Sequence, residues 1–351
     1  MKNLTLLILL FHPFVLAAQT TDSGKVTLNY YAEVYYSYDF QKPDNKTKPG
    51  FIYNHKRHNE VNMNLFLVKA KYQDKNYRTN IGLMFGNYAQ YNLSTEPTWA
   101  QFIYEANIGV KLSGKRNLWL DAGIFPSHIG FESAISADCW TLTRSILAEN
   151  SPYYEAGLRI SYTSQNDRLN LALLYLNGWQ KISRPDYNTT PSFGFQFNYK
   201  LNSKTTFNYS NFIGSDKPDS VHALRHFHNL YLQTEPTKTF GIIVGFDIGS
   251  DKDINNKYGI WYSPVLILRK IVNEKLTVAL RGEYYSDKNQ IIISTNSKNG
   301  FQTAGYSTNL DYKFNDRFQF RIEGKLLNSK DKIFNDSRNN LSFTSNLTFR
   351  L

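Results

Sequence analysis

Alternation of apolar and polar side chains along unusually long segments is the feature that most constrains this chain. Between residues 26 and 40 the even and odd positions separate into two sets. One face carries Val26, Leu28, Tyr30, Ala32, Val34, Tyr36, Tyr38 and Phe40, and the other Thr27, Asn29, Tyr31, Glu33, Tyr35, Ser37 and Asp39. Successive side chains of a β-strand point to opposite faces, so this pattern predicts a single strand much longer than the ~5 to 6 residues of a globular strand.

The same alternation recurs along the chain and predicts about sixteen strands, each near or above the ~9 to 11 residues that cross a bilayer at a tilt. After the first, they are expected at residues 61–72, 77–88, 102–112, 118–125, 154–164, 169–179, 192–201, 205–214, 225–234, 240–248, 258–271, 276–285, 302–314, 318–326 and 341–351. Strands two, ten and twelve alternate poorly, which leaves their facing open. An even number of strands places both chain ends on one side.

The connections between these strands alternate in length. Short polar links follow the even-numbered strands, whereas longer links follow odd-numbered ones, such as residues 41–60, 89–101, 286–300 and 328–340. Outer-membrane barrels have short periplasmic turns and long outer loops. A soluble β-sandwich also alternates, but it seldom needs so many long strands with a fully polar second face. The sequence therefore predicts an all-β fold, a transmembrane antiparallel up-and-down β-barrel.

The longest break in this rhythm is an insert at residues 127–152, which we expect to be the third outer loop, folded into the barrel lumen. Its apolar side chains, Ile129, Phe131, Ile135 and Trp140, are able to pack on the wall. The charges expected to line a pore constriction are Glu132, Asp138, Arg144 and Glu149 in the insert, with Glu155 and Arg159 on the next strand. Opposed charges in a constriction sort polar solutes. A simpler role for Glu132 and Arg144, pairing to hold the insert to the wall, stays equally open.

The N-terminus resembles a secretory signal peptide over residues 1–18, with Lys2 before a short apolar run and Ala17–Ala18 at its end. That run is shorter than the ~18 to 20 residues of a membrane-spanning helix, and no later stretch approaches that length. We therefore expect one barrel domain over residues 19–351. The single cysteine, Cys139, allows no intramolecular disulfide.

Charge and motifs argue against other classes of protein. The net charge is +11, but the lysines and arginines are scattered over turns and strands, and an export signal disfavours a nucleic-acid partner. No phosphate-binding glycine loop, CxxC pair or HExxH motif is present, so we expect no enzyme activity and no cofactor. His222, His226 and His228 form a weak candidate metal cluster, because a further ligand is not evident. We expect these histidines to be an exposed group at the end of a loop.

One segment resembles the OmpL-like β-barrel porin family of Gram-negative outer membranes. The residues that carry the resemblance are 121–125 (DAGIF), 129–132 (IGFE), 143–145 (TRS) and 153–159 (YYEAGLR). The closing strand, residues 341–351, looks like the C-terminal insertion signal of outer-membrane barrels, although it ends in Leu351 and not in an aromatic residue. The resemblance implies an integral outer-membrane location and the barrel assembly machinery as a partner.

These observations predict an outer-membrane porin that passes small hydrophilic solutes or ions by diffusion. The alternative is a barrel with a closed lumen whose loops serve adhesion or surface recognition. Expected partners are outer-membrane lipid and lipopolysaccharide, whose phosphates suit the basic first loop with Lys42, Lys46, Lys48, Lys56 and Arg57. The sequence leaves open the solute, the ion selectivity and whether the barrel is a monomer or a homo-oligomer.

Overall fold

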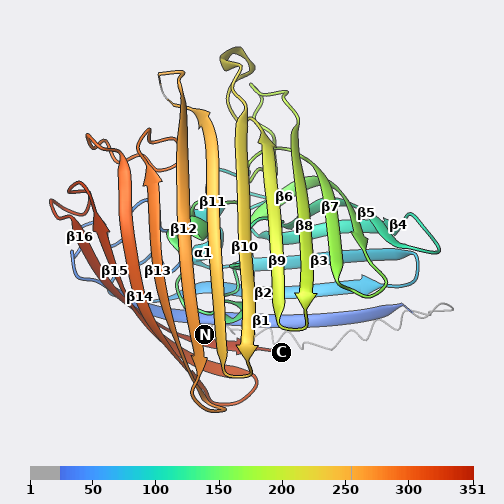
Figure 1. Ribbon diagram of the computed structural model, residues 1–351, viewed down its shortest axis with the longest axis horizontal. Coiled ribbons are helices and arrows are strands. Elements are labelled where there is room, and N and C mark those ends of the chain that lie inside the picture. Colours follow the sequence, from blue (N-terminus) through green and yellow to red (C-terminus); the bar gives the residue numbers. More distant parts are fainter. Residues whose placement is uncertain (1–23, 254) are drawn as a thin grey trace, which may run out of the picture.

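A computed structural model describes residues 24–253 and 255–351, and these residues form a closed barrel of sixteen antiparallel strands in chain order (Figure 1). The expected signal peptide, residues 1–18, lies outside the described residues. The strands are β1 Lys25–Asp39, β2 Val61–Gln73, β3 Tyr77–Phe85, β4 Ile103–Lys111, β5 Asn117–Pro126, β6 Tyr154–Thr163, β7 Leu169–Leu176, β8 Ser192–Asn202, β9 Thr205–Gly214, β10 Arg225–Thr237, β11 Phe240–Lys252, β12 Tyr258–Ile271, β13 Leu276–Asp287, β14 Phe301–Lys313, β15 Phe318–Ser329 and β16 Asn339–Arg350. The prediction of an up-and-down barrel is confirmed.

Closure joins the two ends of the chain. β1 pairs with β16 from Tyr31, opposite Arg350, to Asp39, opposite Ser342. This pairing leaves no free sheet edge, and an unpaired edge is not tolerated in lipid. Figure 1 shows short hairpin turns at one end of strands β8 to β13 and longer connections at the other.

The strand faces divide as the alternation predicts. On β1 the side chains of Tyr31, Glu33 and Tyr35 are buried inside the barrel, whereas Val26 and Leu28 are exposed on the outside. On β16 the buried polar set Asn340, Ser342, Thr344, Asn346 and Thr348 alternates with outward apolar residues. An apolar outer face and a polar inner face are typical of a transmembrane barrel.

Strands β2 and β12 alternate poorly because part of their inner face is apolar. The pairing of β1 with β2 shifts register between Glu33 and Val34, and at this point Leu65 of β2 is buried. On β12 the buried side chains include Val265 and Ile267, which pack against the insert between β5 and β6. Inner-face contacts made by loops therefore override the simple alternation.

Two predicted strands end earlier than expected. β3 stops at Phe85 instead of residue 88, because Gly86 adopts φ +114° and the short helix α1, Asn87–Asn92, follows. β7 stops at Leu176 instead of residue 179, and Trp179 turns to pack on the rings of Phe212 and Phe227.

The other helical segments are short: α2 Ile146–Glu149 and the 3₁₀ turns Ser136–Asp138 and Asp219–Val221. Within the described part of the chain, no helix is long and apolar enough to cross a membrane.

Candidate pore constriction

The insert between β5 and β6 is closed at its base. The strands remain paired up to Pro126 opposite Tyr154, and the backbone N–H of Ser127 donates to the carbonyl of Tyr153 at 3.0 Å. The residues between Ser127 and Tyr153 therefore form a single loop whose two ends are held together by hydrogen bonds. It contains the turn at Ser136–Asp138 and helix α2, whose N-cap Ser145 accepts from the backbone N–H of Ala148.

Cations on the inner face of β13 and β15 bind backbone carbonyls of the insert. Arg321 donates to the carbonyls of Ser136 at 2.6 Å and Cys139 at 3.1 Å. Arg281 donates to the carbonyl of Thr143 at 2.7 Å, and Lys325 donates to that of Arg144 at 3.1 Å. Hydrogen bonds from charged donors are about twice as strong as neutral ones, so these contacts fix this side of the insert.

Acceptors on the same wall bind the insert's N–H groups. Glu323 accepts from the backbone N–H of Thr143 at 2.6 Å, and Glu283 accepts from that of Ile146 at 2.5 Å. Asn309 of β14 accepts from the N–H of Leu142 at 3.0 Å. Side chains of β13, β14 and β15 thereby bind the N–H groups of Leu142, Thr143 and Ile146.

Other contacts tie the insert to different strands. His128 shares its Nδ1 with the carboxylate of Glu155 on β6 at 2.9 Å, and its Nε2 lies 2.8 Å from the carbonyl of Asn211 on β9. Ser136 donates to Glu33 of β1 at 2.8 Å and lies 3.1 Å from Asn346 of β16. The insert thus contacts both β9 and the seam where β1 meets β16.

The apolar residues of the insert pack on the wall. Phe131 and Trp140 lie over Gly245 and Gly241 of β11, where an added Cβ would meet their rings. The Trp140 ring also lies 4.1 Å from the guanidinium of Arg269. Two glycines on the inner face of one strand leave room for two aromatic rings.

Glu132, one of the expected constriction charges, is buried. Its carboxylate accepts from the backbone N–H of Ser145 at 3.1 Å, and Arg281 lies 3.8 Å away. Burial raises the pKa of Glu132, although Arg281 opposes that shift. Its geometry is that of a carboxylate that fixes the start of helix α2.

Arg144 is buried as well and binds three backbone carbonyls of the insert: Ser133 at 2.5 Å, Ala134 at 2.8 Å and Leu142 at 2.7 Å. Among the described residues no ion pair joins it to Glu132. The two side chains therefore hold different parts of the insert and do not pair with each other.

Two further expected charges are buried in contacts between segments. Glu149 accepts from the backbone N–H of Tyr53 at 2.8 Å and of Asn54 at 3.2 Å, which joins the insert to the first loop. Glu155 binds His128. Neither carboxylate reaches open water.

Asp138 and Arg159 are the partly exposed members of the predicted set. Asp138 pairs with Arg350 at 3.0 Å, and both side chains are 45% exposed. Arg159 is 26% exposed, lies 3.4 Å from the carboxylate of Asp121, and stacks over the ring of Phe125. The structure does not bring the six predicted residues together in one ring.

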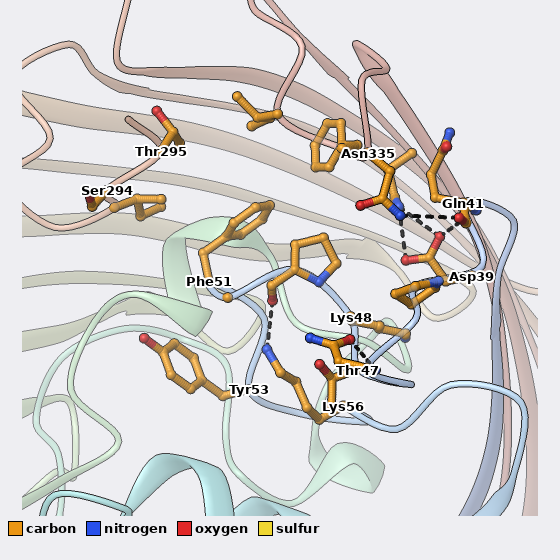
Figure 2. Close-up of a pocket in the computed structure, with 18 of the residues that line it drawn as sticks. Asp39, Gln41, Thr47, Lys48, Phe51, Tyr53, Lys56, Ser294, Thr295 and Asn335 are labelled. Atoms are coloured by element: carbon orange, nitrogen blue, oxygen red, sulfur yellow. Dashed lines mark hydrogen bonds between the residues drawn. The ribbon is translucent and has the colours of Figure 1, made fainter. Parts of the chain in front are cut away.

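The first loop, residues 40–60, exposes only some of the basic residues that the sequence places in it. Lys42 and Lys46 are exposed, but Lys48 and Lys56, both labelled in Figure 2, are buried. The Nζ of Lys56 donates to the carbonyls of Pro49 and Ile52, both at 2.7 Å. His55 of this loop lies 2.7 Å from Glu33 on β1. Because these polar groups bind the wall and the loop itself, the loop packs inward.

The histidine candidates do not gather. His226 and His228 share the outer face of β10, where His228 lies 2.8 Å from the hydroxyl of Tyr209, and His222 follows the turn at Asp219–Val221. Within residues 24–253 and 255–351, no group of three or more His, Cys, Asp or Glu is close enough to hold a metal ion.

The charged wall that binds the insert was only partly visible in the sequence. Arg321 and Glu323 fall on the predicted polar face of their strand, but nothing in the pattern pairs them with the insert. The available signal was the density of charged residues at inner positions of β13 to β15.

A closed sixteen-strand barrel with an apolar outer face and a polar, charged inner wall defines an outer-membrane protein of the porin class. The chain matches the family described as "Putative beta-barrel porin-2, OmpL-like" over residues 25–351, and it belongs to that family. The resemblance noted in the sequence is confirmed, and with it the outer-membrane location and passive channel function. Porins are channels and not enzymes.

Solved structures with the same fold have very different sequences. A loop-deleted OmpT of Vibrio cholerae has a TM-score of 0.63 at 10% identity, covering 94% of this chain and 100% of that one. An anion-selective porin from Comamonas acidovorans has a TM-score of 0.62 at 8% identity, covering 94% of this chain and 100% of that one. The channel DcaP of Acinetobacter baumannii has a TM-score of 0.59 at 9% identity, covering 93% of this chain and 98% of that one. No curated protein matches the chain.

Proposed function

We propose that the insert lies across the lumen and forms the narrowest part of a passive pore for small hydrophilic solutes and ions. The supporting observation is the set of hydrogen bonds from residues 128–146 to inner side chains on β1, β6, β9 and β13 to β16. A loop bound to strands on different sides of a barrel crosses the space between them.

The charges that act on a passing ion are, in this proposal, Asp138 and Arg159. Both side chains reach water, whereas Glu132, Arg144, Glu149 and Glu155 are buried and serve to position the insert. A charge acts on an ion over a few ångströms of poorly screened space, while salt damps it beyond a Debye length of about 8 Å.

Shortening the insert between residues 134 and 147 is expected to raise single-channel conductance in a planar bilayer, because it removes the segment that crosses the pore. Heat-modifiable migration in gels controls for an intact barrel. Unchanged conductance with an intact barrel would show that the insert does not form the constriction, and the alternative of a closed-lumen recognition barrel would gain support.

Neutralising Asp138 as Asp138→Asn is expected to shift the reversal potential in a salt gradient more than Glu132→Gln does. Lys46→Gln, on the exposed part of the first loop, is the matched control and should leave the potential unmoved. A larger shift from Glu132→Gln than from Asp138→Asn would restore Glu132 as a pore-lining charge.

Partners follow from the same proposal. The outward apolar band contacts outer-membrane lipid, and the barrel assembly machinery inserts the chain. Lipopolysaccharide binding at the first loop depends on the exposed Lys42 and Lys46. One similar structure is a trimer form of OmpT of Vibrio cholerae, which supports homo-oligomer formation here, to be measured by cross-linking in native membranes.

A further inference from the structure

A cavity of about 730 Å³ opens between the first loop and the two last long loops, residues 288–300 and 330–338 (Figure 2). It lies at the end of the barrel that carries the long connections. Binding sites for small molecules occupy roughly 300 to 1,000 Å³, so this cavity is large enough to hold a solute before it enters the pore.

Two oppositely charged groups line this cavity, and both are buried. The carboxylate of Asp39 accepts from the backbone N–H of Gln41 at 2.9 Å and from Nδ2 of Asn340 at 2.8 Å. The ammonium of Lys48 donates to Thr344 at 3.0 Å. Within the part of the chain that the structure describes, neither group has an ion-pair partner within 4.0 Å.

Burying these two groups without an ion pair is costly, because their hydrogen bonds to neutral groups replace only part of the lost hydration. Burial lowers the pKa of Lys48 to about 8, with Asp39, Glu149 and Glu323 opposing that shift and Lys325 adding to it. The cavity lining therefore contains a carboxyl and an amino side chain, neither of them in an ion pair among the described residues.

Neutral polar and apolar groups complete the lining. The amides of Gln41, Asn335 and Asn340 supply donors and acceptors, and Nδ2 of Asn335 lies 3.3 Å from the carbonyl of Gln41. Phe51 and Phe334, whose ring centroids are 6.3 Å apart, form an apolar side of the cavity.

We propose that this cavity binds short peptides by their free ends, with the terminal ammonium at Asp39 and the terminal carboxylate at Lys48. The amides match peptide groups, and the aromatic side accommodates peptide side chains. A simple anion would be repelled by Asp39 and a simple cation by Lys48, while a sugar would leave both charges unpaired. The inference rests on the proposed function, in which the bound solute then enters the pore.

The test is calorimetric titration of the full chain in detergent with trialanine, N-acetyl-trialanine, trialanine amide and the doubly capped peptide. Trialanine is expected to bind on the order of tenfold more tightly than either singly capped form, which corresponds to about 1.4 kcal/mol. In Asp39→Asn, acetylating the peptide should no longer weaken binding, whereas amidating it still should. In Lys48→Met, amidation should no longer weaken binding, whereas acetylation still should. Lys48→Arg and the exposed Lys46→Met should bind the four peptides as the unaltered protein does.

Equal binding of free and doubly capped trialanine, or of glucose as tightly as trialanine, would overturn the inference. So would variants at Asp39 and Lys48 that weaken all four peptides equally. Conductance is measured separately in a bilayer, so an open channel without peptide binding contradicts only this inference. Peptide binding without conductance contradicts only the proposed pore.

Discussion

At the scale of single residues, two glycines allow the strands beside the insert to pair. Gly123 of β5 and Gly157 of β6 are opposite each other, with φ of +128° and +152°. A Cβ at either position would collide with a backbone carbonyl of the neighbouring strand, that of Ala106 or of Tyr175. Only glycine adopts such backbone conformations without strain.

Gly123→Ala is therefore expected to destabilise the barrel by about 1 to 3 kcal/mol, the cost of one strained backbone position. The measurement is the urea midpoint of unfolding in detergent, followed by tryptophan fluorescence. Gly114→Ala, in a turn where an added Cβ meets nothing within 4 Å, is the control. Equal urea midpoints for the two variants would show that the stability of the barrel does not depend on glycine at position 123.

At the scale of elements, the last strand closes the barrel. Phe343, Leu347 and Phe349 of β16 lie opposite Tyr38, Val34 and Ala32 of β1, and together they continue the outward apolar face across the seam. The inner side of the same strand binds the insert through Asn346. β16 thus contributes apolar residues to the outer face of the barrel and a hydrogen bond to the insert on its inner face.

Deleting residues 341–351 is expected to leave the protein degraded in the periplasm, because β1 and β15 would both present unpaired edges. Immunoblots of fractionated membranes measure the amount of protein in the outer membrane. A full-length chain with a tag added after Leu351 controls for the effect of changing the C-terminus. Normal accumulation of the truncated chain in the outer membrane would contradict the role of β16.

At the scale of the whole molecule, the connections of unequal length orient the barrel. Short turns such as that at Asp74–Tyr77, held by a backbone hydrogen bond of 2.9 Å, lie at the end opposite the long loops. Outer-membrane barrels keep their long loops outside the cell, so this asymmetry predicts which end faces the periplasm.

An epitope inserted near Asn45 or Lys298 is expected to bind antibody on intact cells, because both residues are exposed on long loops. An epitope near Lys75, in a short turn, should react only after the cells are permeabilised. Labelling at Lys75 on intact cells would reverse the orientation.

The sequence by itself determined the barrel. Period-two alternation depends only on which face of a strand meets lipid, so β1 and β16 could be placed to within a residue or two. The insert could likewise be located, because it interrupts that alternation. The six charges were identified individually, but their partners were not.

The tertiary structure alone decided where those charges act. Glu132 and Arg144 are held by Ser145 and by backbone carbonyls, and Lys48 is buried in the mouth of the barrel. These contacts join residues distant in the sequence, such as Arg321 to Ser136, and depend on the path of loops that have no periodic pattern. Local alternation specifies the face of a strand, whereas the position of a loop inside a barrel depends on every strand it contacts.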